Sequence, residues 1–303
     1  MFNNTHFSGA GSRCFFWNSR QRVKVMLKKI VLIVVGVVAA LYVGLCAVLY
    51  FKQESLLFLP GRLRADYQFN FPGRFEERWF KMADGTRLHG LLFHAPDSKG
   101  LVFYLHGNGG DLSRWADAAP VYTRLGYDVF FLDYRGYGKS EGLISSEKQF
   151  LSDVQTAYRQ LLPEYPESRT VILGYSLGTG PATWLAARQH PKLLILQAPY
   201  FSMRDLATRT YPFVPGLLVR YPLPTNELIT QVQAPIVLFH GDKDEEIYYQ
   251  SSLRLKALLK PSDRLVLLPG AGHNGMTNNP AYQRELTTLL GGNNDTKKRS
   301  DNE

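Results

Sequence analysis

The sequence predicts an α/β fold, with a mostly parallel sheet, helices on both faces, a small cap and one preceding transmembrane helix. Three observations lead to this fold class. Short apolar runs alternate with longer amphipathic segments, as in consecutive β-α-β units. Glycine-rich loops with polar residues follow several of the apolar runs. Residues 30–51 form a run of 22 residues without a charge, long enough for a helix to cross roughly 30 Å of hydrocarbon.

The composition fits one large globular domain with an additional segment. The 303 residues are 45% hydrophobic and 20% charged, which excludes disorder of the whole chain. The net charge is +9, but residues 1–29 contain six basic and no acidic side chains. Because the excess is concentrated there, we expect no nucleic-acid partner. Cys14 and Cys46 precede the globular part, so its core must hold it together without an internal disulfide.

The uncharged run predicts a signal anchor that stays in the protein. It exceeds the roughly 7–15 residues of a signal-peptide core, and no Ala-x-Ala-like cleavage site follows it. A cleaved signal peptide and a buried core helix are the alternatives. Five basic residues lie shortly before the span and three soon after it, which predicts a cytoplasmic amino terminus and a globular domain on the non-cytoplasmic side. Met26 is an alternative start to Met1.

The chain divides into five expected parts. A basic cytoplasmic segment covers residues 1–29, followed by the anchor at 30–51 and a juxtamembrane segment at 52–76. The globular domain covers 77–290. Within it, residues 199–233 are aromatic and proline-rich and interrupt the alternation, which predicts the cap. A polar tail over 291–303 is expected to be disordered.

The elements of the domain are predicted in chain order. Continuous apolar runs predict strands buried on both faces, and longer segments that end at glycine or proline predict helices. In such a sheet, ligands bind beyond the carboxyl ends of the strands. The expected strands are 87–93, 101–105, 128–132, 170–173, 193–196, 236–239 and 264–268, and the expected helices are 113–125, 146–162, 179–190, 251–259 and 281–290.

A Gly-x-Ser-x-Gly sequence at residues 174–178 is the strongest functional signal. It stands directly after an expected strand and before an expected helix, where a sharp turn lifts the serine hydroxyl above the sheet. The turn needs glycines where a side chain would clash. Ser176 is therefore the expected nucleophile.

A serine hydroxyl needs a base, and the base needs an acid that orients it. Both should follow the serine in the chain, the acid first. His273, in a glycine-rich loop after the last strand, is the expected base. The loop after strand 236–239 offers several carboxylates. Asp244 is the expected acid because two more residues let its side chain turn back toward the His loop, and Asp242 is the alternative.

The oxyanion of an acyl transfer needs backbone N–H donors. We expect one from Leu177 and the other from Asn108, in the glycine-rich loop 106–110 after strand 101–105. The loop 133–140 follows another strand and is expected to hold itself together and shape the pocket. The other histidines lack metal-ligand spacing, so neither a metal nor a cofactor is expected.

Together these motifs resemble the α/β-hydrolase superfamily over about residues 77–290. Within it, the segments 106–110, 133–140 and 240–244 look like membrane-anchored α/β-hydrolase domain proteins, relatives of protein depalmitoylases and serine aminopeptidase-like hydrolases. The resemblance implies a triad of Ser176, Asp244 and His273. Family members often have aspartate after Gly-His-Asn, where this chain has Gly275.

The expected function is hydrolysis of an ester or thioester in a small acyl or lipid-like substrate, at a membrane crossed once by the chain. A serine peptidase acting on small peptides is the alternative. Its cap should present a carboxylate to an amino terminus, and residues 199–233 contain only Asp205 and Glu227. A non-catalytic membrane scaffold is an alternative of another class, which the complete set of triad residues disfavours.

Overall fold

The computed structural model describes residues 1 and 11–291, in two units that divide after Lys52. The first unit contains helix α1, Gly11–Phe51. Its part from Gln21 to Phe51 is long and apolar enough to cross a membrane, and its most apolar stretch has no buried residue. The helix thus begins well before the expected span, within the basic segment. Apart from Gly291, the expected disordered tail lies outside the described residues.

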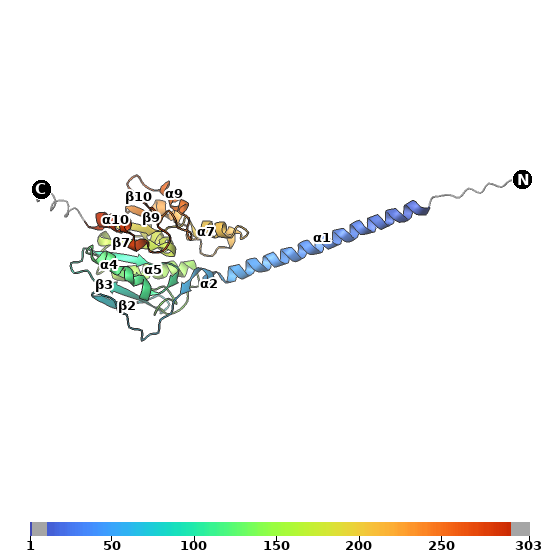
Figure 1. The fold of residues 1–303 in the computed structure, drawn as a ribbon. Coiled ribbons are helices and arrows are strands. Elements are labelled where there is room, and N and C mark those ends of the chain that lie inside the picture. Colours follow the sequence, from blue (N-terminus) through green and yellow to red (C-terminus); the bar gives the residue numbers. More distant parts are fainter. Residues whose placement is uncertain (2–10, 292–303) are drawn as a thin grey trace. The chain divides into compact units, whose positions relative to one another are not determined.

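The second unit is built on an eight-stranded sheet with the order β10-β9-β8-β7-β4-β6-β3-β2 (Figure 1). In this order, all strands from β10 through β4 to β6 are parallel to their neighbours. Strand β3 pairs antiparallel with both β6 and β2. The strands are β2 (Phe75–Lys81), β3 (Arg87–Phe93), β4 (Leu101–Leu105), β6 (Asp128–Leu132), β7 (Thr170–Tyr175), β8 (Leu193–Gln197), β9 (Ile236–Gly241) and β10 (Arg264–Leu268).

Two apolar cores cover the two faces of this sheet. In β4, Leu101, Phe103 and Leu105 point into one core, and Val102 and Tyr104 point into the other. The continuous apolar run is needed because both faces of the strand are buried. The first core is completed by α5 (Glu147–Leu161), α6 (Thr179–Ala186) and α9 (Gln250–Lys256), and the second by α3 (Leu112–Trp115), α4 (Ala119–Thr123) and α10 (Pro280–Leu290).

The structure divides one expected helix and adds a strand that was not expected. The helix expected over 113–125 is divided into α3, a short 3-10 turn and α4, because Pro120 stands in the first turn of α4 and cannot occupy a helix interior. Strand β2 begins inside the expected juxtamembrane segment. Its sequence, Phe-Glu-Glu-Arg-Trp-Phe-Lys, is mostly polar because it is an edge strand with one side exposed.

The juxtamembrane segment belongs to the folded unit. After α2 (Gln53–Leu57), residues Leu59–Pro60 form strand β1, which pairs in parallel with β5, Gly109–Gly110. The expected cap consists of short helices, namely α7 (Met203–Thr210), α8 (Thr225–Leu228) and 3-10 turns at Gly216–Leu218 and Ile229–Gln231.

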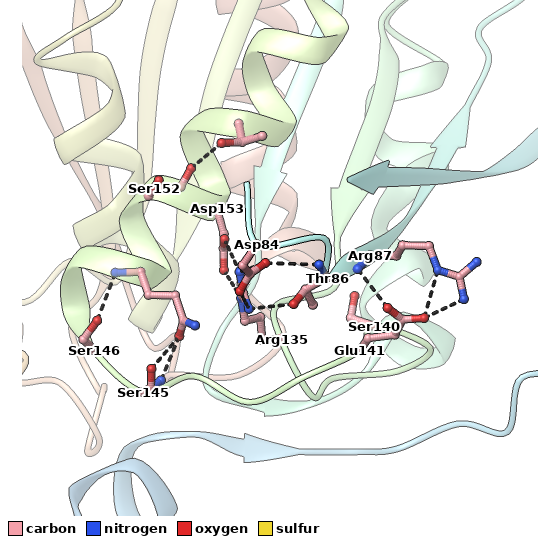
Figure 2. A network of polar contacts seen from close by, with 12 residues as sticks. Asp84, Thr86, Arg87, Arg135, Ser140, Glu141, Ser145, Ser146, Ser152 and Asp153 are labelled. Atoms are coloured by element: carbon pink, nitrogen blue, oxygen red, sulfur yellow. Dashed lines mark hydrogen bonds and ion pairs between the residues drawn. The ribbon is translucent and has the colours of Figure 1, made fainter. Parts of the chain in front are cut away.

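Ion pairs hold the loop after β6 (Figure 2). The Arg135 guanidinium is buried and donates to Asp153 of α5 at 2.9 Å and to Asp84 of the β2–β3 turn at 2.7 Å. On the same loop, Glu141 accepts from Arg87 at the start of β3. These contacts tie the loop to the sheet and to a neighbouring helix.

Candidate functional site

Ser176 lies at the turn between β7 and α6, half-buried, with a positive φ of 52°. A non-glycine residue with positive φ is strained, which is typical of a nucleophile at a sharp strand-to-helix turn. A side chain at Gly178 would overlap the Leu105 carbonyl, and one at Gly174 would overlap the Gly178 carbonyl. The two glycines are thus required by close backbone approach between β4, β7 and the start of α6.

The structure brings the three expected triad residues together. His273 Nε2 lies 3.0 Å from Ser176 Oγ, and His273 Nδ1 lies 2.8 Å from Asp244 Oδ2. The three residues come from the carboxyl ends of β7, β9 and β10, the edge at which a parallel sheet binds ligands. His273 and Asp244 are buried. This arrangement can move a proton from the hydroxyl to a histidine whose other nitrogen is held by a carboxylate.

The Asp244 carboxylate is fully hydrogen-bonded. Its Oδ1 accepts from the N–H groups of Glu246 at 3.0 Å and Ile247 at 2.8 Å, and its Oδ2 lies 3.2 Å from His240 Nε2. Burial alone would raise the pKa of this carboxyl, but the hydrogen bonds from His240, His273 and Ile247 outweigh it and hold the pKa well below its ordinary value. Asp244 is therefore ionised at neutral pH.

Asp242, the alternative acid, binds the backbone of the His loop and not the His273 side chain. Its Oδ1 accepts a hydrogen bond from the Gly270 N–H at 2.7 Å, at the start of the loop that carries His273. No hydrogen bond or ion pair joins Asp242 to His273 among the described residues. Asp242 thus braces the base of the His loop. The Lys243 N–H, which donates to the Ala271 carbonyl, and the Tyr175 hydroxyl, which donates to the His273 carbonyl, also hold this loop.

The loop from His106 to Gly110 lies against the nucleophile turn. A side chain at Gly107 would stand 3.7 Å from Ser176 Cβ, so this backbone passes next to the serine. The Asn108 carbonyl accepts from Tyr137 Oη at 2.6 Å and from Leu59 N–H at 2.9 Å. Burial lowers the pKa of His106 to about 4, so its ring is neutral where it stacks on Trp115.

Three residues near the site were not anticipated from the sequence. Glu246 Oε2 lies 3.6 Å from His273 Nε2. The Trp115 ring packs on Gly107, where an added Cβ would stand 3.0 Å from it. Tyr137 holds the Asn108 carbonyl. Only the four-carboxylate run at 242–246 pointed toward Glu246, and the two aromatic residues carried no signal of their own. A cavity of ≈ 190 Å³ beside the His loop is lined by Tyr104, Arg114, Trp115, Tyr175 and Asn274, among others.

No group of three or more His, Cys, Asp or Glu side chains that could hold a metal ion occurs within residues 11–291 as described. The buried histidines have other partners. His240 Nδ1 lies 2.6 Å from Ser252 Oγ, and His240 Nε2 lies 2.8 Å from the Ile247 carbonyl oxygen. His89 lies between Asp133 and Glu77.

Asp133 is a buried carboxyl outside the triad. Its Oδ2 lies 3.2 Å from His89 Nδ1, and its Oδ1 has no partner among the described residues. Burial raises its pKa from 3.8 to about 6. A folded-state pKa above the unfolded value means that this group favours folding below about pH 4, and that the contribution is lost as the pH rises through about 6.

We expect Asp133→Asn to remove this pH dependence. The unfolding free energy of the wild type should fall, relative to the variant, by on the order of 2 kcal/mol between pH 4 and 6. Urea unfolding of the detergent-solubilised full chain at pH 4, 5, 6 and 7 measures the difference. His106, whose pKa is lowered by burial, makes the protein more stable as the pH rises. This effect is the same in the wild type and the variant, so it cancels in the difference. Parallel stability curves for the two proteins would contradict the expectation.

Comparisons with known sequences identify relatives over most of the chain. The family model described as serine aminopeptidase, S33, matches residues 96–225. An uncharacterized protein of Mycobacterium tuberculosis is 31% identical over 248 residues, covering 80% of this chain and 87% of that protein. The alpha/beta hydrolase domain-containing protein 17B of Homo sapiens is 28% identical over 234 residues, covering 75% of this chain and 80% of that protein.

Solved structures share the fold. An esterase of Pyrococcus furiosus superposes with a TM-score of 0.60 at 18% identity, covering 76% of this chain and 98% of that chain. An alpha-beta hydrolase of Vibrio vulnificus superposes with a TM-score of 0.60 at 22% identity, covering 73% of this chain and 81% of that chain. These likenesses confirm the α/β fold predicted for the globular domain.

Proposed function

Since the chain belongs to the α/β-hydrolase superfamily and is a hydrolase, we propose that it cleaves an ester or thioester at a membrane surface, with Ser176 as nucleophile. The observation that carries the proposal is the hydrogen-bonded series from Ser176 Oγ through His273 to Asp244, at 3.0 and 2.8 Å. Each member has a position that nucleophilic catalysis requires.

The first step is attack on the acyl carbonyl carbon. As Ser176 Oγ bonds to that carbon, its proton passes to His273 Nε2, and the carbonyl oxygen becomes an oxyanion. The ionised Asp244 holds the other nitrogen of His273 in its protonated form and stabilises the imidazolium. The N–H groups of Leu177 and Asn108 are the proposed oxyanion donors. Among the described residues, no backbone acceptor takes the Asn108 N–H.

Two further steps complete the cycle. His273 gives its proton to the leaving alcohol or thiol as the carbon–oxygen or carbon–sulfur bond breaks, which leaves an acyl group on Ser176. Water then attacks the acyl carbon, with His273 again taking a proton, and the acid is released as Ser176 regains its hydrogen.

The expected cap supports an acyl substrate over a peptide. Of its two acidic residues, Asp205 already binds Arg254 at 2.9 Å, Arg209 at 3.0 Å and the Tyr248 hydroxyl. The amino terminus of a peptide substrate would have to compete with the guanidinium groups of Arg254 and Arg209 for the Asp205 carboxylate. The same segment exposes apolar side chains, with Leu217 exposed by 82% and Tyr211 and Phe213 also exposed. Glu246, beside His273, is the carboxylate that would serve the peptidase alternative.

The proposed membrane setting rests on α1. Its apolar part has the length and composition of a membrane-spanning helix. The five basic residues between positions 20 and 29, against three soon after the span, support a cytoplasmic amino terminus. The catalytic unit, which begins directly after Lys52, would then lie on the opposite side of the membrane.

A fluorophosphonate tests the function and its setting together. We expect it to label the full chain in carbonate-washed membranes, with the adduct mapped by mass spectrometry to Ser176. A membrane-impermeant fluorophosphonate should label sealed right-side-out vesicles without permeabilisation. In the same membranes, p-nitrophenyl esters and acyl thioesters of rising chain length should be cleaved faster than aminoacyl substrates.

Each failure has its own meaning. An adduct on another residue would refute Ser176 as the nucleophile, and labelling only after permeabilisation would refute the orientation. A preference for aminoacyl substrates would favour the serine peptidase. An intact, folded chain that neither reacts with the probe nor cleaves any substrate would favour the non-catalytic scaffold.

A further inference from the structure

We propose that the anchor-proximal segment, residues 53–61, positions the oxyanion loop, residues 106–110. The segment begins at Gln53, the first residue of the second unit, and belongs entirely to that unit. The inference rests on the proposed function, because it requires the Asn108 N–H to act on the oxyanion. In this role the segment and its partner Tyr137 are positioning groups, which never touch the substrate.

The first support is a short parallel sheet between the two segments. Leu59 pairs with Gly109 and Pro60 with Gly110. The Leu59 N–H donates to the Asn108 carbonyl at 2.9 Å, and the Gly61 N–H donates to the Gly110 carbonyl at 2.8 Å. A glycine-rich loop has many accessible conformations. Pairing with a strand selects one of them for Gly109 and Gly110, which have no side chains that could do so.

Tyr137 joins the two segments to the loop after β6. Its hydroxyl donates to the Asn108 carbonyl at 2.6 Å and accepts from the Leu59 N–H at 3.1 Å. The ring is fully buried and contacts His106 and Tyr134. The Asn108 carbonyl therefore has two donors, the Tyr137 hydroxyl and the Leu59 N–H, which are also bonded to each other. With its carbonyl held twice, the residue that carries the proposed oxyanion donor cannot rotate freely.

The other end of the segment is also fixed. Gln53 donates to the Leu218 carbonyl at 2.6 Å and accepts from the Arg220 N–H at 2.8 Å, while Glu54 binds the Tyr221 hydroxyl at 2.9 Å. Phe58 is buried between Phe150 and Tyr221. The segment thus connects the expected cap to the oxyanion loop. Because it follows the membrane helix directly, the stretch of chain leaving the membrane forms part of the active-site framework.

Two pairs of variants of the full-length chain test the proposal. Tyr137→Phe removes one hydroxyl that holds the loop, and Tyr158→Phe removes a buried hydroxyl without a partner in the described structure. Leu59→Pro removes the N–H that binds Asn108, and Leu59→Ala keeps this N–H while shortening a side chain that is 52% exposed. The second pair decides the question if Tyr137→Phe does not fold.

We expect Tyr137→Phe and Leu59→Pro to lower kcat about tenfold, the loss expected for one hydrogen bond that acts in the transition state. KM for a p-nitrophenyl ester should stay the same. The inhibition constant of an aryl trifluoromethyl ketone, which binds as a tetrahedral oxyanion adduct, should rise by the same factor as kcat falls. If these residues only stabilised the fold, their replacement would lower the melting temperature, and the inhibition constant would not rise by the factor by which kcat falls. Both control variants should behave as the wild type.

The results separate this inference from the proposed function. If the wild type hydrolyses esters through Ser176 but each variant matches its control in kcat and ketone inhibition, the positioning role is refuted and the function stands. If KM rises while kcat is unchanged, the segment shapes substrate binding and the inference is again refuted. An inert wild type refutes the proposed function itself.

Discussion

Replacing Ser176 with alanine is expected to lower kcat for ester hydrolysis by about 10⁶-fold, the loss that deletion of the nucleophile causes in a serine protease. The acyl-enzyme cannot form without Oγ, and the His273 nitrogen, 3.0 Å from that oxygen, loses the proton that it accepts. Fluorophosphonate labelling should disappear as well. Steady-state kinetics and gel-based labelling of the full chain in detergent measure the two effects.

Ser152→Ala is the matched control. Ser152 lies on α5, is exposed, and takes part in hydrogen bonding through its backbone carbonyl (Figure 2). Its replacement should leave kcat and labelling unchanged. Both variants should melt near the wild-type temperature, because the Ser176 side chain fills little of the core. A Ser176→Ala protein that still hydrolyses short acyl esters at the wild-type rate would remove the basis of the proposed mechanism.

Replacing Asp244 with asparagine is expected to lower kcat/KM by about 10³–10⁴-fold, as the corresponding change does in a protease triad. Two backbone N–H groups bind Oδ1, so the amide oxygen of asparagine will occupy that position. The amide NH₂ then faces His273 Nδ1. Because NH₂ only donates, Nδ1 must lose its hydrogen and Nε2 must carry it. His273 in that tautomer cannot take the Ser176 proton.

Two other carboxylates of the same loop give the comparison. Glu245→Gln should retain full activity, because this side chain is exposed. Asp242→Asn should lose a small fraction of what Asp244→Asn loses, since an amide oxygen can still accept from the Gly270 N–H. Values of kcat/KM with a short p-nitrophenyl ester, together with melting temperatures, measure the series. A large loss in Asp242→Asn with near wild-type activity in Asp244→Asn would make Asp242 the acid.

The order of strands and helices could be predicted from the sequence because burial leaves a local pattern. The strands at 87–93, 101–105, 128–132 and 264–268 have the predicted bounds, and the other predicted strands extend by one or two residues at their carboxyl ends. A strand covered on both faces needs a continuous apolar run, which is legible along the chain. The position of Ser176 between β7 and α6 could be predicted because the apolar run of the buried strand β7 ends directly before it.

Features that depend on contacts between distant segments were not predictable. Edge strand β2 has a mostly polar sequence because its burial is partial, and the β1–β5 pair involves two residues from each of two segments about 50 positions apart. Neither produces a local periodicity. Tyr137 likewise reads as one more aromatic residue until the fold brings its hydroxyl to the Asn108 carbonyl.

The acid position shows the boundary between the two sources of information. The sequence by itself determined that a carboxylate follows β9 and that His273 follows β10, because parallel strands end at one edge. Only the tertiary structure decided that Asp244 faces His273 while Asp242 bonds Gly270. Only Lys243 separates the two carboxylates in the chain. The direction of each side chain depends on backbone hydrogen bonds between loops that are distant in sequence.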